Sequence, residues 1–138
     1  MDKDELKRMI REILNETEFG PAVKAVKLPG VHVTENDRLD TGNPTDQVYT
    51  HDLFSLAESP RLGAGLMEMR RTIFPWTLTY DEIDYVIEGK LSIVIDGHTV
   101  TAGPGEVILI PKGSSIQFSV PDYARFLYVT YPADWQNQ

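Results

Sequence analysis

The most informative stretch of the chain runs from Phe74 to Gly89, FPWTLTYDEIDYVIEG. Its apolar residues are typical of a core strand, but aromatic, hydroxyl and acidic side chains alternate among them. In an extended chain, alternate side chains point to opposite faces. Whichever face is buried, at least one carboxylate is buried with it. One face carries Trp76, Leu78, Tyr80, Glu82, Asp84 and Val86, and the other carries Thr77, Thr79, Asp81, Ile83, Tyr85 and Ile87.

A second stretch, Gly105 to Gly113 (GEVILIPKG), is a continuous apolar run closed by proline and glycine. Such a run predicts a strand that is buried on both faces and stops at a tight turn. Together, the two stretches predict a barrel with acidic side chains inside.

Short strands and turns recur along the rest of the chain. Asp96-Gly97 is typical of a hairpin turn, and Pro75 predicts a bend between Phe74 and Trp76. The regular spacing favours an antiparallel sandwich or barrel, so the predicted fold class is all-β. Trp135, after the last strand, is expected to fold back on the domain. The other expected strands are Val31–Val33, Val48–Phe54, Gly63–Ile73, Leu91–Ile95, His98–Thr101, Val107–Ile110, Ile116–Val120 and Arg125–Tyr131.

The first residues, Met1 to Glu16, have apolar side chains at helical spacing and predict a short amphipathic helix. One interpretation is that its apolar stripe packs on the chain's own barrel or on a second subunit. The other is a targeting peptide that docks on another assembly, because a linker-like break follows at residues 17–21. The expected organisation is a helix over 1–16, an irregular extension over 17–47 and one barrel domain over 48–135.

Composition narrows the function classes. The formal charge of −8 argues against binding to nucleic acid or to an anionic membrane surface, and no apolar run is long enough to span a membrane. The absence of cysteine excludes disulfides, thiolate chemistry and cysteine metal sites, and suits a reducing, cytoplasmic compartment. Of the three histidines, His32 and His51 are expected to be neither metal ligands nor bases, and His98 is expected to be solvent-exposed at the hairpin turn.

Two spacings in the chain resemble the cupin family of small antiparallel jelly-roll barrels. Glu82 to Gly89 matches the first cupin motif, and Gly105 with Pro111-Lys112-Gly113 matches the second. The histidines that bind metal in that family fall on Trp76, Leu78 and Ile116, none of which can do so. The resemblance therefore implies a cupin barrel without a transition metal, and it disfavours a metal-dependent dioxygenase or isomerase.

A closer resemblance, from Val48 to Trp135, is to the EutQ family of ethanolamine-utilisation proteins. It rests on GLMEMRRTIFPWTLTYDEIDYVIEGKLSIVIDG and on the ending RFLYVTYPADW. The resemblance implies a metal-free cupin associated with a bacterial microcompartment, and acetate kinase activity that exchanges phosphoryl between ATP and acetate. It also favours the targeting interpretation of the helix, with shell or cargo proteins as partners.

The cupin register turns Glu82 and Asp84 into the barrel. Because two carboxylates in a restricted pocket disfavour each other's ionisation, we expect at least one raised pKa and a candidate general acid or base. Tyr80 or Tyr85 is the expected hydrogen-bonding orienter. The alternative is a structural role, in which backbone amides or an arginine, Arg70 or Arg125, satisfy both acids.

A kinase needs Mg²⁺ and positive charge on the phosphates. The hypothesis is that Glu82 and Asp84 hold Mg²⁺·ATP, with Arg70 and Lys112 as the cofactor-binding cations and Arg71 nearby. No glycine-rich loop followed by Lys-Ser or Lys-Thr is present. The competing hypothesis is a non-catalytic cupin that binds a small metabolite or a shell protein. A homodimer is expected in either case.

Overall fold

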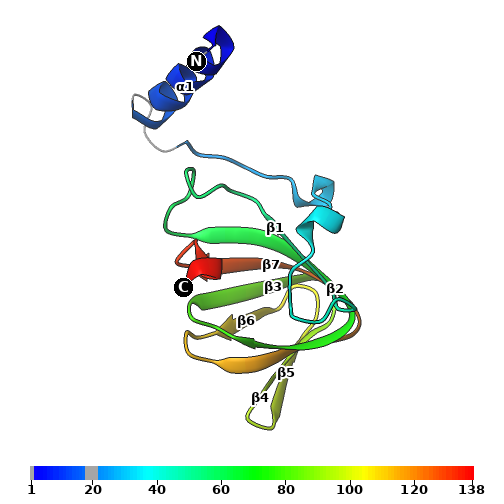
Figure 1. The fold of residues 1–138 in the computed structure, drawn as a ribbon. Coiled ribbons are helices and arrows are strands. Elements are labelled where there is room, and N and C mark those ends of the chain that lie inside the picture. The colour runs from blue at the N-terminus through cyan, green and yellow to red at the C-terminus, as the bar shows by residue number, and fades with distance from the viewer. Residues whose placement is uncertain (1, 18–21) are drawn as a thin grey trace.

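The computed structural model describes residues 2–17 and 22–138, and it consists mainly of antiparallel strands (Figure 1). One helix, α1 (Lys3–Thr17), precedes a segment with two short 3₁₀ helices, η1 (Leu28–Gly30) and η2 (Glu35–Asp37). The strands then follow, and a last 3₁₀ helix, η3 (Trp135–Asn137), ends the chain. The seven strands are β1 (Gln47–Asp52), β2 (Gly63–Thr77), β3 (Asp81–Gly89), β4 (Leu91–Ile95), β5 (His98–Ala102), β6 (Val107–Ile110) and β7 (Ser115–Tyr131).

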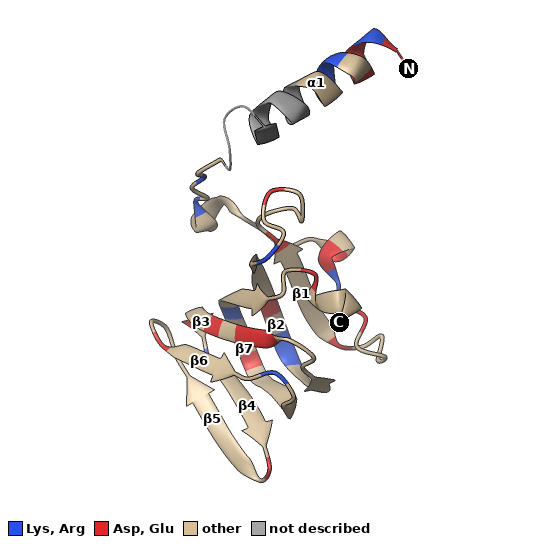
Figure 2. Ribbon diagram, turned by 90° about the vertical axis from the view of Figure 1, so that its left-hand side faces the viewer, with Lys and Arg blue, Asp and Glu red and all other residues tan. Residues whose placement is uncertain are grey.

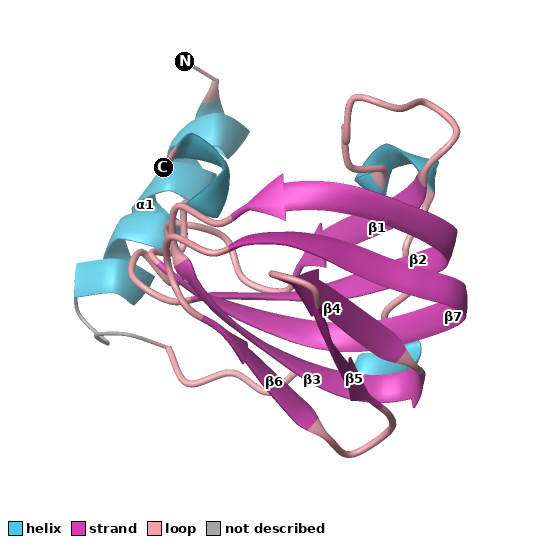
Figure 3. Ribbon diagram, turned by 90° about the horizontal axis from the view of Figure 1, so that it is seen from below, coloured by secondary structure: helices cyan, strands magenta, loops and turns pink. Residues whose placement is uncertain are grey.

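The strands form two facing layers because β2 and β7 are long enough to take part in both. Residues 63–70 of β2 and 123–131 of β7 belong to the layer β1-β2-β7-β3-β6. Residues 72–77 of β2 and 115–120 of β7 belong to the layer β2-β7-β4-β5. Figure 3 shows the strands from below. Among the described residues no ladder joins β1 or β6 to β5, so the predicted all-β class is confirmed while the sheet stays open instead of closing into a barrel.

The long strands correct three details of the sequence prediction. The bend predicted at Pro75 is absent, because Pro75 pairs with Gln117 inside β2. The irregularity lies earlier, at Arg71, where the register shifts and φ is 42°. The strands predicted as Ile116–Val120 and Arg125–Tyr131 are one strand, and the stretch from Phe74 to Gly89 is divided between β2 and β3.

The predicted strand Val31–Val33 is also absent, because this segment finds no ladder partner. It is held instead by a side chain of β7: Arg125 Nη2 donates to the carbonyl oxygens of Leu28 (2.8 Å) and Val31 (2.9 Å). Two contacts then attach the extension to β1. Leu39 N donates to Val48 O at 2.9 Å, and Arg38 bridges to Tyr49.

The core fills the space between the two layers with apolar side chains. Fully buried members include Phe74, Phe126, Met69 and Leu78, and the rings of Phe74 and Phe118 stack at 5.2 Å. The strand predicted to be buried on both faces, β6, buries only one. Ile108 and Ile110 point into the core, whereas Val107 and Leu109 are 59% and 65% exposed on the outer face.

The predicted amphipathic helix is present as α1, and it lies apart from the sheets in Figures 1 and 2. Three of its apolar side chains, Leu6, Met9 and Ile10, are exposed. The sequence also predicts packing of two further apolar residues, Ile13 and Leu14, whose side chains lie outside the described part of the structure. The predicted linker-like break, residues 17–21, lies largely outside the described residues. No helix among the described residues is long and apolar enough to cross a membrane.

Candidate functional site

The acid-bearing face predicted from the sequence is the inner face of the sandwich. Leu78, Tyr80, Glu82, Asp84 and Val86 are all buried, although a turn at residues 78–80 separates β2 from β3. The opposite positions, from Thr77 to Tyr85, are exposed. Figure 2 shows the resulting acidic positions along β3, which lie beside β7 and β6. The prediction that carboxylates point into the fold is confirmed.

The two buried acids are Glu82 and Asp84, at 6% and 0% exposure. Burial raises the pKa of both carboxyl groups, because the interior solvates a charge poorly. The negative charge of Glu82 raises the pKa of Asp84 further. Both oxygens of Asp84 lack a hydrogen-bonding partner among the described residues. Asp84 is therefore favoured in its neutral form, and the pair holds a proton to a higher pH than free carboxyl groups do.

An inner cavity of about 20 Å³ lies beside Glu82, between the two layers. Its walls come from both layers: Met67 and Phe74 of β2, Phe118 and Tyr128 of β7, and Glu82 of β3. A volume of this size holds about one water molecule.

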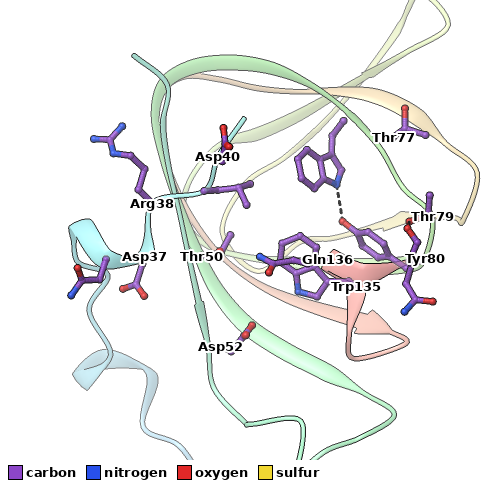
Figure 4. Close-up of a pocket in the computed structure, with 14 residues that line it drawn as sticks. Asp37, Arg38, Asp40, Thr50, Asp52, Thr77, Thr79, Tyr80, Trp135 and Gln136 are labelled. Atoms are coloured by element: carbon purple, nitrogen blue, oxygen red, sulfur yellow. Dashed lines mark hydrogen bonds between the residues drawn. The ribbon is translucent and has the colours of Figure 1, made fainter. Parts of the chain in front are cut away.

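An outer pocket of about 580 Å³ opens next to the inner cavity (Figure 4). The two spaces share five lining residues, so one lies directly behind the other. These residues are Leu39, Thr50, Trp76, Tyr80 and Trp135. The outer rim carries three carboxylates, Asp37, Asp40 and Asp52. Its volume is in the range of small-molecule sites.

Aromatic rings form the wall between the outer pocket and the inner cavity. Trp135 of η3 contacts Tyr80 (ring centroids 5.7 Å apart), Trp76 (6.2 Å) and Tyr128 (6.2 Å). Trp76 Nε1 donates a hydrogen bond to the hydroxyl of Tyr80 at 2.8 Å. The expectation that Trp135 folds back on the domain is confirmed, and its indole covers the entrance to the cavity that Glu82 lines.

Tyr128 connects this wall to the rim, because its hydroxyl donates to Asp52 Oδ1 at 2.8 Å. The ring reaches β1 by crossing β2 at Gly65, where a Cβ atom would lie only 2.0 Å from the Tyr128 hydroxyl oxygen. Burial raises the pKa of Tyr128 and of Tyr80, and the negative charges of Asp52 and Glu82 respectively raise them further. Both phenols stay protonated.

The structure brings together only some of the residues predicted for the site. Tyr80 lies beside Glu82 and Asp84, but Tyr85 is on the outer face of β3, 42% exposed, and cannot orient either acid. Arg70 and Lys112 are absent from the lining of both spaces. Arg70 instead lies over the ring of Tyr123, 4.4 Å from its centroid. The backbone N–H of Lys112 donates to Asp81 at 2.8 Å on the exposed side of β3.

Neither arginine named in the structural alternative, Arg70 or Arg125, pairs with the two acids. Arg125 makes its ion pair with Glu68, at 2.7 Å, rather than with Glu82 or Asp84. Arg70 is exposed. Of the histidines, His51 pairs with Asp37 through Nδ1 at 3.0 Å, and His98 is exposed. In the part of the chain that the structure describes, no three His, Cys, Asp or Glu side chains are grouped to hold a metal ion.

Sequence reasoning missed the rim of the outer pocket. Asp37 and Asp40 lie in the irregular extension, and Asp52 at the end of β1, so no periodicity marks them. The turn residues Asn36-Asp37 and Thr41–Pro44 around them indicate only a loop. Their convergence comes from the attachment of the extension to β1 through Leu39 and Val48.

Comparison with known proteins gives the same family as the sequence resemblance described above. The family model described as "Ethanolamine utilisation protein EutQ" matches residues 2–137. A curated relative from Clostridioides difficile (strain 630), named acetate kinase EutQ, is 58% identical, and the match covers 100% of this chain and 96% of the relative.

Two solved structures place the fold. The Clostridium difficile EutQ protein is 70% identical, with a TM-score of 0.83 over 84% of this chain and 85% of that chain. The cupin domain of Schizosaccharomyces pombe Cnp3 is only 19% identical, with a TM-score of 0.58 over 84% of this chain and 79% of that one, and shows the fold alone. The fold is therefore that of a cupin, and this chain belongs to the EutQ family of ethanolamine-utilisation proteins.

Proposed function

We propose that this chain serves ethanolamine utilisation as an acetate kinase that exchanges phosphoryl between ATP and acetate. The observation that carries the proposal is an open pocket with carboxylates at its rim and a buried acid behind it. The name of the C. difficile relative, which matches over the whole chain, supports the reaction. Magnesium nucleotides need oxygen ligands, and Mg²⁺ is usually held by one or two carboxylates together with water and phosphate.

The rim suits Mg²⁺·ATP better than the buried pair does. Asp40 and Asp52 are exposed and line the pocket, whereas Asp84 is fully buried and favoured in its neutral form. We assign the Mg²⁺ ligands to Asp40 and Asp52. In its protonated form, which burial favours by raising its pKa, Glu82 can donate a hydrogen bond to one oxygen of acetate while the other attacks the γ-phosphorus and ADP leaves.

The test is acetyl phosphate formation by the purified protein with ATP, Mg²⁺ and acetate. Asp52→Asn should raise the KM for Mg²⁺·ATP roughly tenfold, the effect of one lost ligand worth about 1.4 kcal/mol. Glu82→Ala should lower kcat/KM for acetate by a similar factor. Glu88→Gln, which removes a charge from an exposed position of the same strand, should change neither. Wild-type rates in both site variants would remove this pocket from the reaction.

The second candidate function is a non-catalytic cupin that binds a small metabolite or a partner protein. One observation favours it: Arg38 is the single Lys or Arg among the lining residues, and its guanidinium is occupied. Arg38 Nε donates to Glu35 at 3.2 Å, and its Nη atoms donate to Asp46 O at 2.6 Å and to Tyr49 at 2.7 Å. This function predicts no acetyl phosphate formation at any protein concentration.

The outer face of β3 and β6 supports a homodimer. Ile83 pairs with Leu109 and Tyr85 with Val107 across the two strands, and all four side chains are 42–65% exposed. An apolar patch on a sheet, next to an edge strand, is typical of an association surface. Sedimentation of wild type and Leu109→Lys tests the proposal: the variant should be monomeric, and equal sedimentation would exclude this face.

The helix α1 supports association with a microcompartment, with shell or cargo proteins as partners. Its exposed apolar residues, Leu6, Met9 and Ile10, fit a partner groove. In cells that form shells, a fluorescent fusion lacking residues 1–16 should become diffuse while the full chain gives foci. Foci from both fusions would refute the proposal.

A further inference from the structure

Three buried oxygen atoms near Glu82 lack hydrogen-bonding partners among the described residues. They are both carboxyl oxygens of Asp84 and Oγ1 of Thr130. Thr130 is directly opposite Glu82 in the ladder between β3 and β7, and Asp84 lies on the same face of β3 as Glu82. Buried polar atoms without partners are rare, and these three lie next to Glu82, the one of the three residues that lines the inner cavity.

Two of the hydrogen-bond donors around the inner cavity are already used. Trp76 Nε1 donates to Tyr80, and the hydroxyl of Tyr128 donates to Asp52. Among the residues that the structure describes, no Lys, Arg or His side chain lines the cavity, whereas the carboxyl group of Glu82 does. A group that brings several hydrogen-bond donors therefore suits this lining.

The size of the cavity limits that group further. About 20 Å³ accommodates one non-hydrogen atom with its hydrogens. A primary ammonium group has this size and carries three donors. A phosphate or a hydrated Mg²⁺ is too large.

The route into the cavity is suited to a cation. Trp76, Tyr80 and Trp135 line both spaces, and Trp135 meets the other two rings at 64° and 50°, so the rings form walls instead of a stack. Aromatic faces attract organic ammonium ions. The rim carboxylates Asp37 and Asp40 favour the same charge in the outer pocket.

From these observations we propose that this site binds the primary ammonium group of a small organic amine. The –NH₃⁺ group occupies the inner cavity against Glu82, and the short carbon chain lies between the aromatic rings toward the outer pocket. This ligand is distinct from the nucleotide and acetate of the proposed reaction. It competes with acetate for Glu82, but its binding does not depend on that activity.

The pH dependence of the amine's affinity distinguishes this acidic site from a site without ionisable groups. The titratable groups facing Glu82 are Asp84 on its own strand, Tyr80 before it and Tyr128 of β7, with Asp52 of β1 behind Tyr128. None of them is basic. An entering ammonium ion therefore favours ionisation of the acid pair and releases a proton, so affinity should rise with pH by up to tenfold per unit while the free pair is protonated.

The experiment is a fluorescence titration without nucleotide, because the chain's two tryptophans, Trp76 and Trp135, both line the site. The probes are ethanolamine hydrochloride and its neutral analogue ethylene glycol, with KCl at matched ionic strength. We expect a saturable change with ethanolamine only, tighter at pH 8 than at pH 6. Glu82→Gln, which keeps the side-chain shape, should weaken binding at least tenfold, and Glu88→Gln should leave it unchanged. Thermal unfolding of both variants verifies that they are folded.

Each other outcome overturns the proposal. No saturable change with ethanolamine means that the cavity serves only a structural water. Equal responses to ethylene glycol or KCl exclude recognition of the ammonium group, and equal affinity in Glu82→Gln moves the ligand elsewhere. Acetyl phosphate formation is measured separately, so loss of the kinase function and loss of this site are distinguishable.

Discussion

The first layer of the sandwich contains two buried acidic clusters with opposite arrangements. On its outer face, Glu68 accepts from Arg125 at 2.7 Å and from Tyr123 at 3.3 Å. Arg125 is also held by two carbonyl oxygens of the extension. On its inner face, Glu82 and Asp84 share one strand. Within the described part of the chain, no basic side chain pairs with them and the carboxyl oxygens of Asp84 have no hydrogen-bonding partner.

This difference distinguishes charged side chains that stabilise the fold from acidic side chains that are available to a ligand or a reaction. The Glu68–Arg125 cluster is complete within the chain, so it can only hold the extension against β2 and β7. The Glu82–Asp84 pair is incomplete, and it lies beside a cavity that opens toward a pocket. Buried acids without partners reduce stability, and proteins retain them chiefly where a ligand or a reaction needs them.

The largest expected effect is on the complete cluster. Arg125→Met should lower the free energy of unfolding by roughly 3–5 kcal/mol, because it leaves Glu68 with Tyr123 as its remaining donor and removes the Arg125 hydrogen bonds to the carbonyls of Leu28 and Val31. Urea denaturation followed by circular dichroism measures it. A loss below ~1 kcal/mol would show that this cluster is not the structural one.

For the Glu82–Asp84 pair, we expect a smaller change in the free energy of unfolding, and one of opposite sign. Asp84→Asn should raise the free energy of unfolding at pH 7 by about 1–3 kcal/mol, because it removes an ionisable group that the folded state keeps unpaired.

The pH dependence of the free energy of unfolding tests whether ionisation of Asp84 destabilises the fold. Because burial raises the pKa of Asp84, the folded protein holds its proton to a higher pH than the unfolded chain does. Wild-type stability should therefore fall as pH rises from about 4, the unfolded pKa, toward the raised pKa, on the order of 1 kcal/mol per pH unit. Denaturation at several pH values should show a flatter profile for Asp84→Asn. Parallel profiles would contradict the raised pKa.

The smallest effect is expected at Arg70, the exposed neighbour of the complete cluster. Arg70→Ala loses only its contact with the ring of Tyr123, so stability should change by less than ~1 kcal/mol. Acetyl phosphate formation should stay within about twofold of wild type, because Arg70 does not line the pocket. A tenfold loss of activity would restore the cofactor role that the sequence suggested for it.

The inner face of the site was predictable from the sequence because alternation is a local property. From residue 78 to residue 86, every even-numbered side chain is buried, and the turn before β3 does not interrupt this alternation. Counting every second residue from Trp76 therefore identified the buried acids correctly. Arg125 was not predictable as the partner of Glu68. Their contact joins β7 to β2 through a register that no local pattern contains.

The pocket itself could not be predicted for the same reason. Asp40 comes from the extension, Asp52 from β1 and Trp135 from η3, and only the tertiary fold brings them to one opening. Likewise, the apolar run of β6 predicts two buried faces, but whether a second surface covers the outer one depends on association and not on the strand's own sequence.

The irregularity at Arg71, where β7 has one residue more than β2, determines which side chains of β2 face the pocket wall. Before it, the inward positions of β2 are odd-numbered (Met67, Met69); after it they are even-numbered (Thr72, Phe74, Trp76). Arg70 and Arg71 are two consecutive exposed positions, and strict alternation through them would turn Trp76 out to solvent and Pro75 and Thr77 inward. One backbone irregularity remote from the acids thus keeps Trp76 in the wall that encloses them, although neither arginine lines the pocket.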